Sequence, residues 1–239
     1  MSPLEIRRLG LGDDQLDFAS VWQHQRDLHA QRCAEEIGDV ALMLEHTPVF
    51  TAGTRTEPHE RPSDGSPVID IDRGGKITFH GPGQLVAYPI VALPAHVLVV
   101  DYVRRVEEAM IRTVTDLGVA CGRVPGRSGV WLPADDRGPD RKVAAIGIRV
   151  ARGVTMHGLA INGDVDLAWY GRIVPCGIAD AGVTSLAREL GRPVPSTEIA
   201  DVLEPHLVEL LDWQPYRPSE DLSVVPDDGV RYGLAGHLA

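Results

Sequence analysis

Cys176 is the residue of this sequence whose type and neighbours best suit covalent chemistry. It lies between Pro175 and Gly177, and a proline and a glycine at these places predict a constrained loop that gives the thiol little side-chain cover. An accessible thiolate is a strong nucleophile. Free cysteines are more often small buried apolar residues, and we expect that role for Cys33, in a predicted helix, and Cys121, in a short predicted strand.

Lys142 opens the apolar run 142–148, and it is one of only two lysines among 23 basic residues, the other being Lys76. A lysine at the start of a strand is usually a solvated strand end. Lysine differs from arginine because its surroundings can tune its pKa, so that it can lose a proton. Lysine at position 142, in a chain that otherwise uses arginine, therefore favours proton transfer, although the same property belongs to Lys76.

A glycine-rich stretch, residues 73–84, reads RGGKITFHGPGQ and is a further candidate site. Its glycines let a backbone approach a ligand closely and expose N–H groups, but a hairpin turn followed by a sharp bend has the same composition. The spacing matches neither a Walker loop nor a dinucleotide-binding fingerprint. His157, beside Gly158 in a predicted strand, is either a base, a binding residue or a buried core histidine.

The apolar periodicity predicts the elements that must position these residues. Helices are expected over 13–37, from Asp101 as the N-cap to Leu117, and over 184–190 and 197–211, the last interrupted or kinked at Pro205. Strands are expected near 40–45, 68–72, 84–93, 119–124, 129–132, 143–150 and 154–162, and residues 73–80 are expected to form a turn followed by another strand. The tail 214–239 is expected to be irregular. This order predicts an α/β (α+β) fold, a mixed central sheet with flanking helices.

Composition excludes several classes of protein. The net charge of −11 argues against a nucleic-acid binder, which needs a basic surface. The N-terminus lacks the apolar core of a secretory signal, so a cytoplasmic location is expected. Residues 77–100 carry no charge but contain three prolines, so they do not form one membrane-spanning helix. No clustered metal ligands occur, and no metal is expected.

Four segments together resemble the lipoyl(octanoyl) transferase family. They are RGGKITFHGPGQLVAYP (73–89), KVAAIGI (142–148), HGLAIN (157–162) and PCGI (175–178). Four motifs in the same order make a specific match that covers roughly residues 70–180, and we expect a single catalytic domain over 1–239. The resemblance implies the fold of the biotin and lipoate protein ligases.

The resemblance also implies an enzyme that moves an octanoyl group from octanoyl-acyl carrier protein to a lysine of a lipoyl domain. The acceptors implied are the lipoyl domains of 2-oxoacid dehydrogenase complexes and the glycine cleavage H protein, with no cofactor and a monomeric enzyme. In the family the residue matching Cys176 forms a thioester acyl-enzyme, and the residue matching Lys142 lowers its pKa. The substrate-binding residues implied are Arg73, Gly74, Gly75, Lys76, Ile77, Thr78, Phe79, His80, Ala145, Ile146, Gly147, Gly158, Leu159 and Ala160, with His157 in support.

Three other functions stay open from the residues alone. An ATP-dependent lipoate or biotin ligase on the same fold would need no cysteine nucleophile. A non-catalytic acyl-binding or lipoyl-domain-binding protein would bind without turnover, and a cysteine hydrolase would release the free acid.

The charge is unevenly distributed along the chain. Residues 101–152 carry 10 basic and 7 acidic side chains and form the one net-positive segment. We expect a basic face there that guides the acidic carrier protein. The arginines expected on it are Arg104, Arg105, Arg123, Arg127, Arg141 and Arg149.

Overall fold

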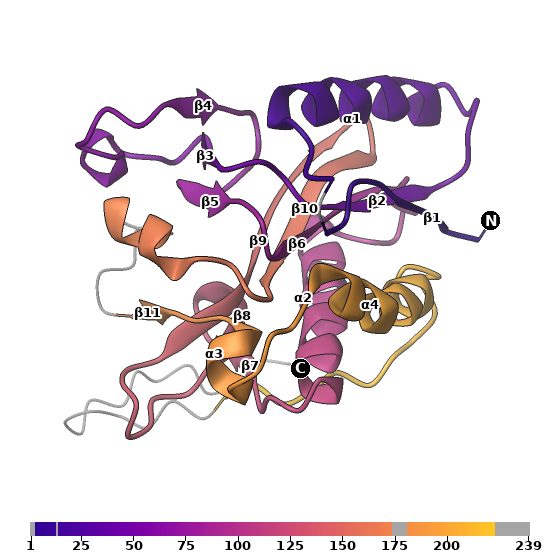
Figure 1. The fold of residues 1–239 in the computed structure, drawn as a ribbon. Helices are drawn as coiled ribbons and strands as arrows, with labels where there is room; N and C mark the ends of the chain where they lie inside the picture. Colours follow the sequence, from indigo (N-terminus) through magenta and orange to yellow (C-terminus); the bar gives the residue numbers. More distant parts are fainter. Residues whose placement is uncertain (1–2, 13, 174–180, 223–239) are drawn as a thin grey trace.

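A computed structural model of the chain describes residues 3–12, 14–173 and 181–222. At its centre lies an eight-stranded mixed sheet with the strand order β1-β2-β6-β10-β9-β8-β7, and β11 pairs with the first residues of β9 (Figure 1). The β1–β2 and β9–β11 pairs are parallel and the others are antiparallel. The strands are β1 (Glu5–Arg8), β2 (Val40–Leu44), β6 (Gln84–Ile90), β7 (Gly122–Val124), β8 (Arg127–Leu132), β9 (Arg141–Ala151), β10 (Val154–Asn162) and β11 (Gly182–Val183).

The central strands are apolar on both faces because helices cover both faces. Side chains alternate along a strand, so that in β6 Leu85 joins one core cluster and Val86 joins another. On the side of Leu85 lie α2 (Val99–Asp116) and α4 (Ser196–Leu210), and on the side of Val86 lies α1 (Phe18–Cys33) (Figure 1). Burial explains the uncharged stretch from residue 77 as far as Val91, whereas Leu98, Val99 and Val100 at its end are exposed.

A second, three-stranded sheet carries the glycine-rich stretch. It has the order β4-β3-β5 and consists of β3 (Val49–Ala52), β4 (Val68–Asp70) and β5 (Thr78–His80). Gly75, in the loop before β5, has φ +89°, a conformation that glycine adopts without strain. The short elements η1 (Pro58–Glu60), β11, η2 (Leu167–Arg172) and α3 (Leu186–Leu190) complete the fold. Phe79 of β5 stacks on Trp169 of η2 with ring centroids 4.9 Å apart.

Two local expectations for the helices were wrong. Asp101 is not the N-cap of α2: the helix begins at Val99, and the Asp101 carboxylate accepts the N–H of Leu98, 3.1 Å away. The helix α4 continues through Pro205, so the expected interruption is absent, and a kink there stays a prediction. Leu203 and Leu207 are fully buried on either side of the proline, and this packing holds the helix where one backbone hydrogen bond is missing.

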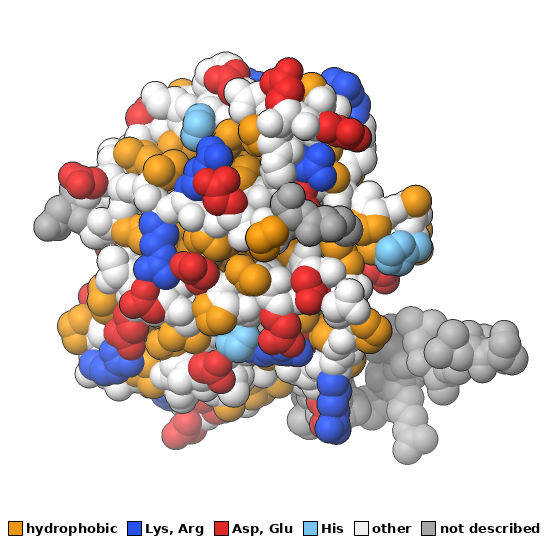
Figure 2. All heavy atoms as spheres, turned by 90° about the vertical axis from the view of Figure 1, so that its right-hand side faces the viewer, with side chains coloured by type: hydrophobic (Ala, Val, Ile, Leu, Met, Phe, Trp, Pro, Cys, Tyr) orange, Lys and Arg blue, Asp and Glu red, His pale blue; other side chains and the backbone are white. Residues whose placement is uncertain are grey.

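Two of the six arginines expected on a basic face over residues 101–152 are buried against carboxylates, so they add little charge to such a face. Arg123 is buried, and its Nη2 donates to Glu108 at 2.7 Å. Arg141 is buried as well, and it donates to Glu189 at 2.7 Å. On the face shown in Figure 2, acidic and basic side chains are interspersed.

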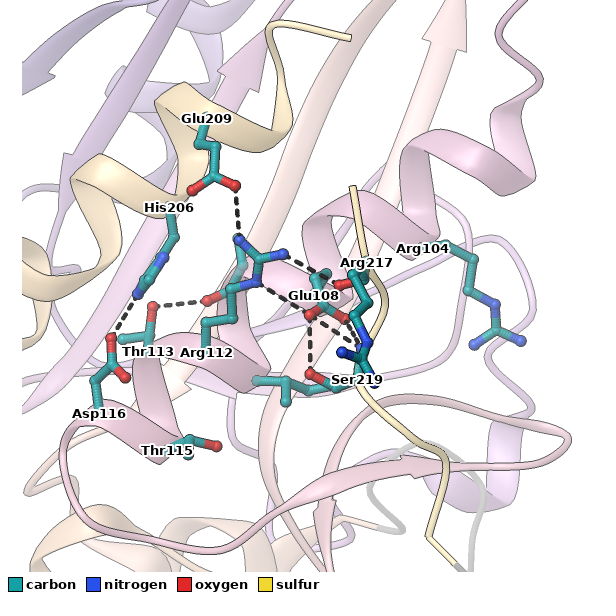
Figure 3. Close-up of polar contacts among 12 residues, drawn as sticks. Arg104, Glu108, Arg112, Thr113, Thr115, Asp116, His206, Glu209, Arg217 and Ser219 are labelled. Carbon is teal, nitrogen blue, oxygen red and sulfur yellow. Dashed lines mark hydrogen bonds and ion pairs between the residues drawn. The ribbon is translucent and has the colours of Figure 1, made fainter. Parts of the chain in front are cut away.

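Glu108 of α2 is the centre of one such network (Figure 3). Its carboxylate is 1 % exposed and accepts from Arg112 Nε at 3.1 Å and from the backbone N–H of Ser219 at 3.0 Å. Arg112 also reaches Glu209 of α4 at 2.9 Å. The segment after α4 is therefore fastened to α2 by charge-assisted hydrogen bonds.

None of the helices within the described residues is long and apolar enough to cross a membrane.

Candidate active site

A cavity of about 260 Å³ lies against β9 and β10 and brings most of the predicted site residues together. In the register of the two strands Gly147 lies opposite Gly158, and Ala145 lies opposite Ala160. The predicted residues that line the cavity are Arg73, Gly75, Lys76, Thr78, His80, Lys142, Ala145, Ile146, Gly147, His157, Gly158, Leu159 and Ala160. Segments separated by some 70 residues in sequence thus share one wall.

Three predicted substrate-binding residues do not line this cavity. Ile77 and Phe79 are fully buried in the cluster beneath the small sheet, because their side chains alternate with those of Thr78 and His80. Gly74 acts through its backbone, and its N–H donates to the carbonyl of Ile148 at 2.9 Å. These residues support the site from outside the cavity.

Cys176 lies outside the described residues. The chain before and after that segment is placed, and Gly182 and Val183 of β11 pair with Arg141 and Lys142 of β9. The N–H of Thr184 donates to the carbonyl of Lys142 at 2.9 Å.

Arg73 fixes the shape of the glycine-rich loop. Its side chain is buried, and the guanidinium donates to the carbonyls of Lys76 at 2.8 Å, Gly74 at 3.0 Å and Thr51 at 2.9 Å. Gly147 leaves room for this arginine, since a Cβ there would lie 2.9 Å from Arg73 Cδ. Arg73 therefore links the glycine-rich loop to the small sheet by hydrogen bonds and packs against β9 at Gly147.

The two lysines have different surroundings. Lys76 is 31 % exposed, and its Nζ is paired with the carboxylate of Glu60. Lys142 is 7 % exposed, and its Nζ lies 4.6 Å from the ring centroid of Trp131. An arginine would also suit the pair at Lys76, whereas a buried lysine on the wall of a cavity is suited to proton transfer.

His80 presents a neutral imidazole to the cavity. Its Nδ1 lies 2.7 Å from Gln84 Oε1, and the Gln84 amide nitrogen donates to Asn162 and Tyr170, both at 2.9 Å. Since the amide oxygen accepts, Nδ1 carries the proton and Nε2 is an acceptor. Burial, with His46 and Arg73 nearby, lowers the pKa of His80 to about 3.

His157 is held in a left-handed conformation in the middle of β10, with φ +57°. The Oε1 of Gln25 accepts its backbone N–H at 3.0 Å, and Asp72 accepts its Nε2–H at 2.8 Å. Burial, followed by the charges of Arg73 and Arg149, lowers the pKa of His157 to about 3. The Asp72 carboxylate does not reverse this, because Arg149 already neutralises it. A conformation this uncommon for a residue other than glycine persists only where surrounding contacts fix it.

Sequence reasoning missed seven cavity residues, of which Tyr88 and Phe18 are the most buried. The Tyr88 hydroxyl donates to His46 Nε2 at 2.8 Å, and His46 Nδ1 donates to the carbonyl of Leu16 at 3.0 Å. Burial lowers the pKa of His46 to about 4. Tyr88 lies within the matched segment 73–89, so it could have been predicted from the sequence. Phe18 lies outside the four segments, and nothing in the neighbouring sequence marks it as a cavity residue. The others are Arg55, Ile71, Gly126, Arg127 and Ser128.

Tyr88 lines the cavity several positions along the sheet from Lys142. The register places Ala87 opposite Leu159, so Tyr88 lies level with Gly158 and, across β10, with Gly147. Gly147 lies five positions after Lys142 in β9, about 16 Å along an extended strand.

Cys121 has the properties expected of a packing residue. Burial raises the pKa of its thiol to about 11, and its Sγ donates to the carbonyl of Ile111 at 3.6 Å. A thiol with so high a pKa is protonated at neutral pH and is a poor nucleophile.

Residues 17–208 match the family described as the lipoyl protein ligase A/B catalytic domain, and the protein belongs to that family. A bipartite lipoate protein ligase from Thermoplasma acidophilum, solved in a study of that enzyme and its E2 lipoyl domain, has the same fold. Its TM-score is 0.61 at 14 % identity, over 92 % of this chain and 88 % of the other. The predicted fold class is confirmed.

Curated relatives show which members of this family the chain resembles. The octanoyltransferase of Salinispora tropica is 62 % identical over 82 % of this chain and 92 % of its own length. That of Thermobifida fusca is 55 % identical over 91 % of this chain and 94 % of its own length. The chain is thus a member of the octanoyltransferases, as the resemblance of its four motifs predicted.

Proposed function

We propose that the protein transfers an octanoyl group from octanoyl-acyl carrier protein to a lysine of a lipoyl domain, through a thioester on Cys176 and with Lys142 as the proton carrier. The observation that carries this proposal is the buried Lys142 on the wall of an acyl-sized cavity. The pairing of β11 with the strand of Lys142 supports it, since β11 begins six residues after Cys176.

The first half-reaction is a thioester exchange. Lys142 takes the proton of the Cys176 thiol, and the thiolate attacks the carbonyl carbon of the donor thioester. The bond to the carrier sulfur breaks, and that sulfur takes the proton back from the Lys142 ammonium. An ammonium about 4 Å from a thiolate favours it by up to roughly 4 kcal/mol at an effective dielectric of 20. One thioester replaces another, so the step needs no ATP.

The second half-reaction forms an amide. The amine of the acceptor lysine attacks the acyl-enzyme carbonyl, the bond to Cys176 breaks, and the amine proton passes to Lys142 or to the leaving thiolate. Backbone N–H groups near Gly158 or Cys176 are the candidates for the oxyanion hole. Neutral His80 and His157 suit this step, because they add no positive charge to a site that must admit an acceptor lysine.

The cavity accounts for the acyl group. Burying seven methylene or methyl groups contributes about 5 kcal/mol at roughly 0.8 kcal/mol each. One methylene more or less changes affinity only severalfold, so discrimination against longer chains requires a closed end. Phe18 and Tyr88, which are buried and line the cavity, are the candidates for that end.

The test is incubation with octanoyl-acyl carrier protein, followed by intact-mass measurement. We expect one hydroxylamine-labile octanoyl adduct, lost in Cys176→Ser and kept in the matched control Cys121→Ser. An adduct that persists in Cys176→Ser would refute the nucleophile. Lys142→Arg keeps the charge but no removable proton and should lose turnover far more than Lys76→Arg, the same change at the lysine paired with Glu60.

An ATP-dependent ligase is the second candidate, because a lipoate ligase shares the fold. Activity of Cys176→Ala with free octanoate, ATP and Mg²⁺ would favour it. Transfer by the wild-type protein without ATP, lost in that variant, favours the thioester route.

A further inference from the structure

The indole of Trp131 lies against the Lys142 ammonium. Trp131 on β8 and Lys142 on β9 are cross-strand partners, and Nζ lies 4.6 Å from the ring centroid. Trp131 is 1 % exposed and Lys142 is 7 % exposed, so little water competes for the ammonium. A cation over an indole face at this distance is attracted by the ring quadrupole, and the attraction is strongest where both groups are desolvated.

The indole is fixed in place by its own strand. Its Nε1 donates to the carbonyl of Ser128 at 3.2 Å, and the register of β8 against β9 shifts between Val130 and Trp131. Such an irregularity re-aims the side chain that follows it. Gly129, with φ +95°, donates its N–H to the buried carboxylate of Glu107 at 2.9 Å. The ring is therefore held before any substrate binds.

The charged side chains around this contact oppose a further positive charge. Arg127 of β8 lies 5.4 Å from the same ring. From the small sheet and its loops come Arg55, Arg73 and Lys76, of which Lys76 is paired with Glu60, while His80 is neutral. Like charges repel, so a contact that attracts the Lys142 ammonium offsets part of this repulsion.

We propose that Trp131 is a positioning residue that stabilises the Lys142 ammonium and thereby favours the thiolate–ammonium pair at Cys176 over the thiol–amine pair. The proposal rests on the function proposed above. Proton transfer from the thiol creates the ammonium, and only the charged form gains from the ring quadrupole. A desolvated contact of this kind shifts the ratio of the two forms by a factor of roughly ten.

The experiment replaces Trp131 site-specifically by tryptophans that carry one to four fluorines, which weaken the ring quadrupole and largely preserve its shape. The readout is the rate of alkylation of Cys176 by iodoacetamide as a function of pH. We expect the alkylation rate at pH 7 to fall with each added fluorine, to roughly one tenth of the wild-type rate for the tetrafluoro ring. The pH at which the rate is half-maximal should rise by about one unit. Thermal unfolding should stay unchanged. The alkylation rate of Trp131→Leu should be no higher than that of the tetrafluoro protein.

The matched control is the same series of fluorinated tryptophans at Trp213. This residue belongs to the core cluster beneath α2 and α4, and Arg105 lies 5.8 Å from its ring. It should leave the alkylation profile unchanged. A flat Trp131 series, combined with slow alkylation in Lys142→Met, would overturn the role of the indole and leave the function of Lys142 standing. Unchanged alkylation and transfer in Lys142→Met would overturn both.

Discussion

Three buried histidines on or beside the cavity make the stability of this protein depend on pH. His46, His80 and His157 have pKa values lowered by burial to about 4, about 3 and about 3. In the unfolded chain each returns to about 6.5. Between these values the unfolded chain binds more protons than the folded one, so stability is fully present above about pH 6.5 and falls as the pH falls towards 4.

The magnitude follows from proton linkage. Between pH 7 and pH 5.5, a histidine that is neutral when folded and has a pKa of 6.5 when unfolded costs about 1.2 kcal/mol of stability. Three such histidines together cost about 4 kcal/mol, a large part of the roughly 5–15 kcal/mol typical of a folded domain. Over this range most carboxylates remain charged, which leaves the histidines as the main contributors.

The assay is urea unfolding at pH 7 and pH 5.5, with the free energy of unfolding extrapolated to water. The variant His46→Gln removes one titrating group, and we expect its loss of stability between the two pH values to be smaller by about 1.2 kcal/mol. A wild-type protein equally stable at both pH values would refute the reasoning. So would a His46→Gln variant with the full wild-type dependence.

Three further predictions concern the cavity and the core. Tyr88→Ala should enlarge the cavity beside Gly158, so that decanoyl adducts form as readily as octanoyl adducts when the two donors compete, measured by intact mass. Gly147→Ala should clash with Arg73 Cδ and cost about 1–3 kcal/mol of unfolding free energy, with slower formation of the adduct. Arg123→Met removes the 2.7 Å partner of the buried Glu108, which keeps Arg112, and should cost about 1–3 kcal/mol, seen as a lower Tm without a changed preference for acyl chain length.

Much of the fold was predictable because its signals are local. The helix α2 follows an apolar periodicity of 3.6 residues, and β10 is bounded by Gly153 and Gly163. The errors came from tertiary contacts. The Asp101 carboxylate binds the backbone one turn before its own position, and packing on either side keeps α4 continuous through Pro205.

The site shows the same division. Residues within the matched motifs were found, but motif membership did not separate Thr78 and His80, which line the cavity, from Ile77 and Phe79, which do not. That separation depends on which face of β5 meets β9 and β10. Phe18 comes from a helix outside the motifs and reaches the cavity only through the packing of α1.

The charges illustrate why composition alone misleads about surfaces. A net-positive segment suggested a basic face, yet Arg123 and Arg141 are buried against carboxylates, where they hold the fold together. Electrostatic guidance of an acidic donor would therefore depend on the cations around the cavity mouth, such as Arg55 and Arg127, more than on α2.

The scarcity of lysine takes on meaning once the two lysines are placed. Lys76 serves an ion pair with Glu60, a role that needs a cation but no exchange of protons. Lys142 is buried on the wall of the cavity, with its ammonium beside the indole of Trp131. A lysine can accept a proton in one half-reaction and return it in the next, and arginine, which stays protonated in proteins, cannot. The proposed transfer therefore requires lysine at position 142, because it requires a reversible charge.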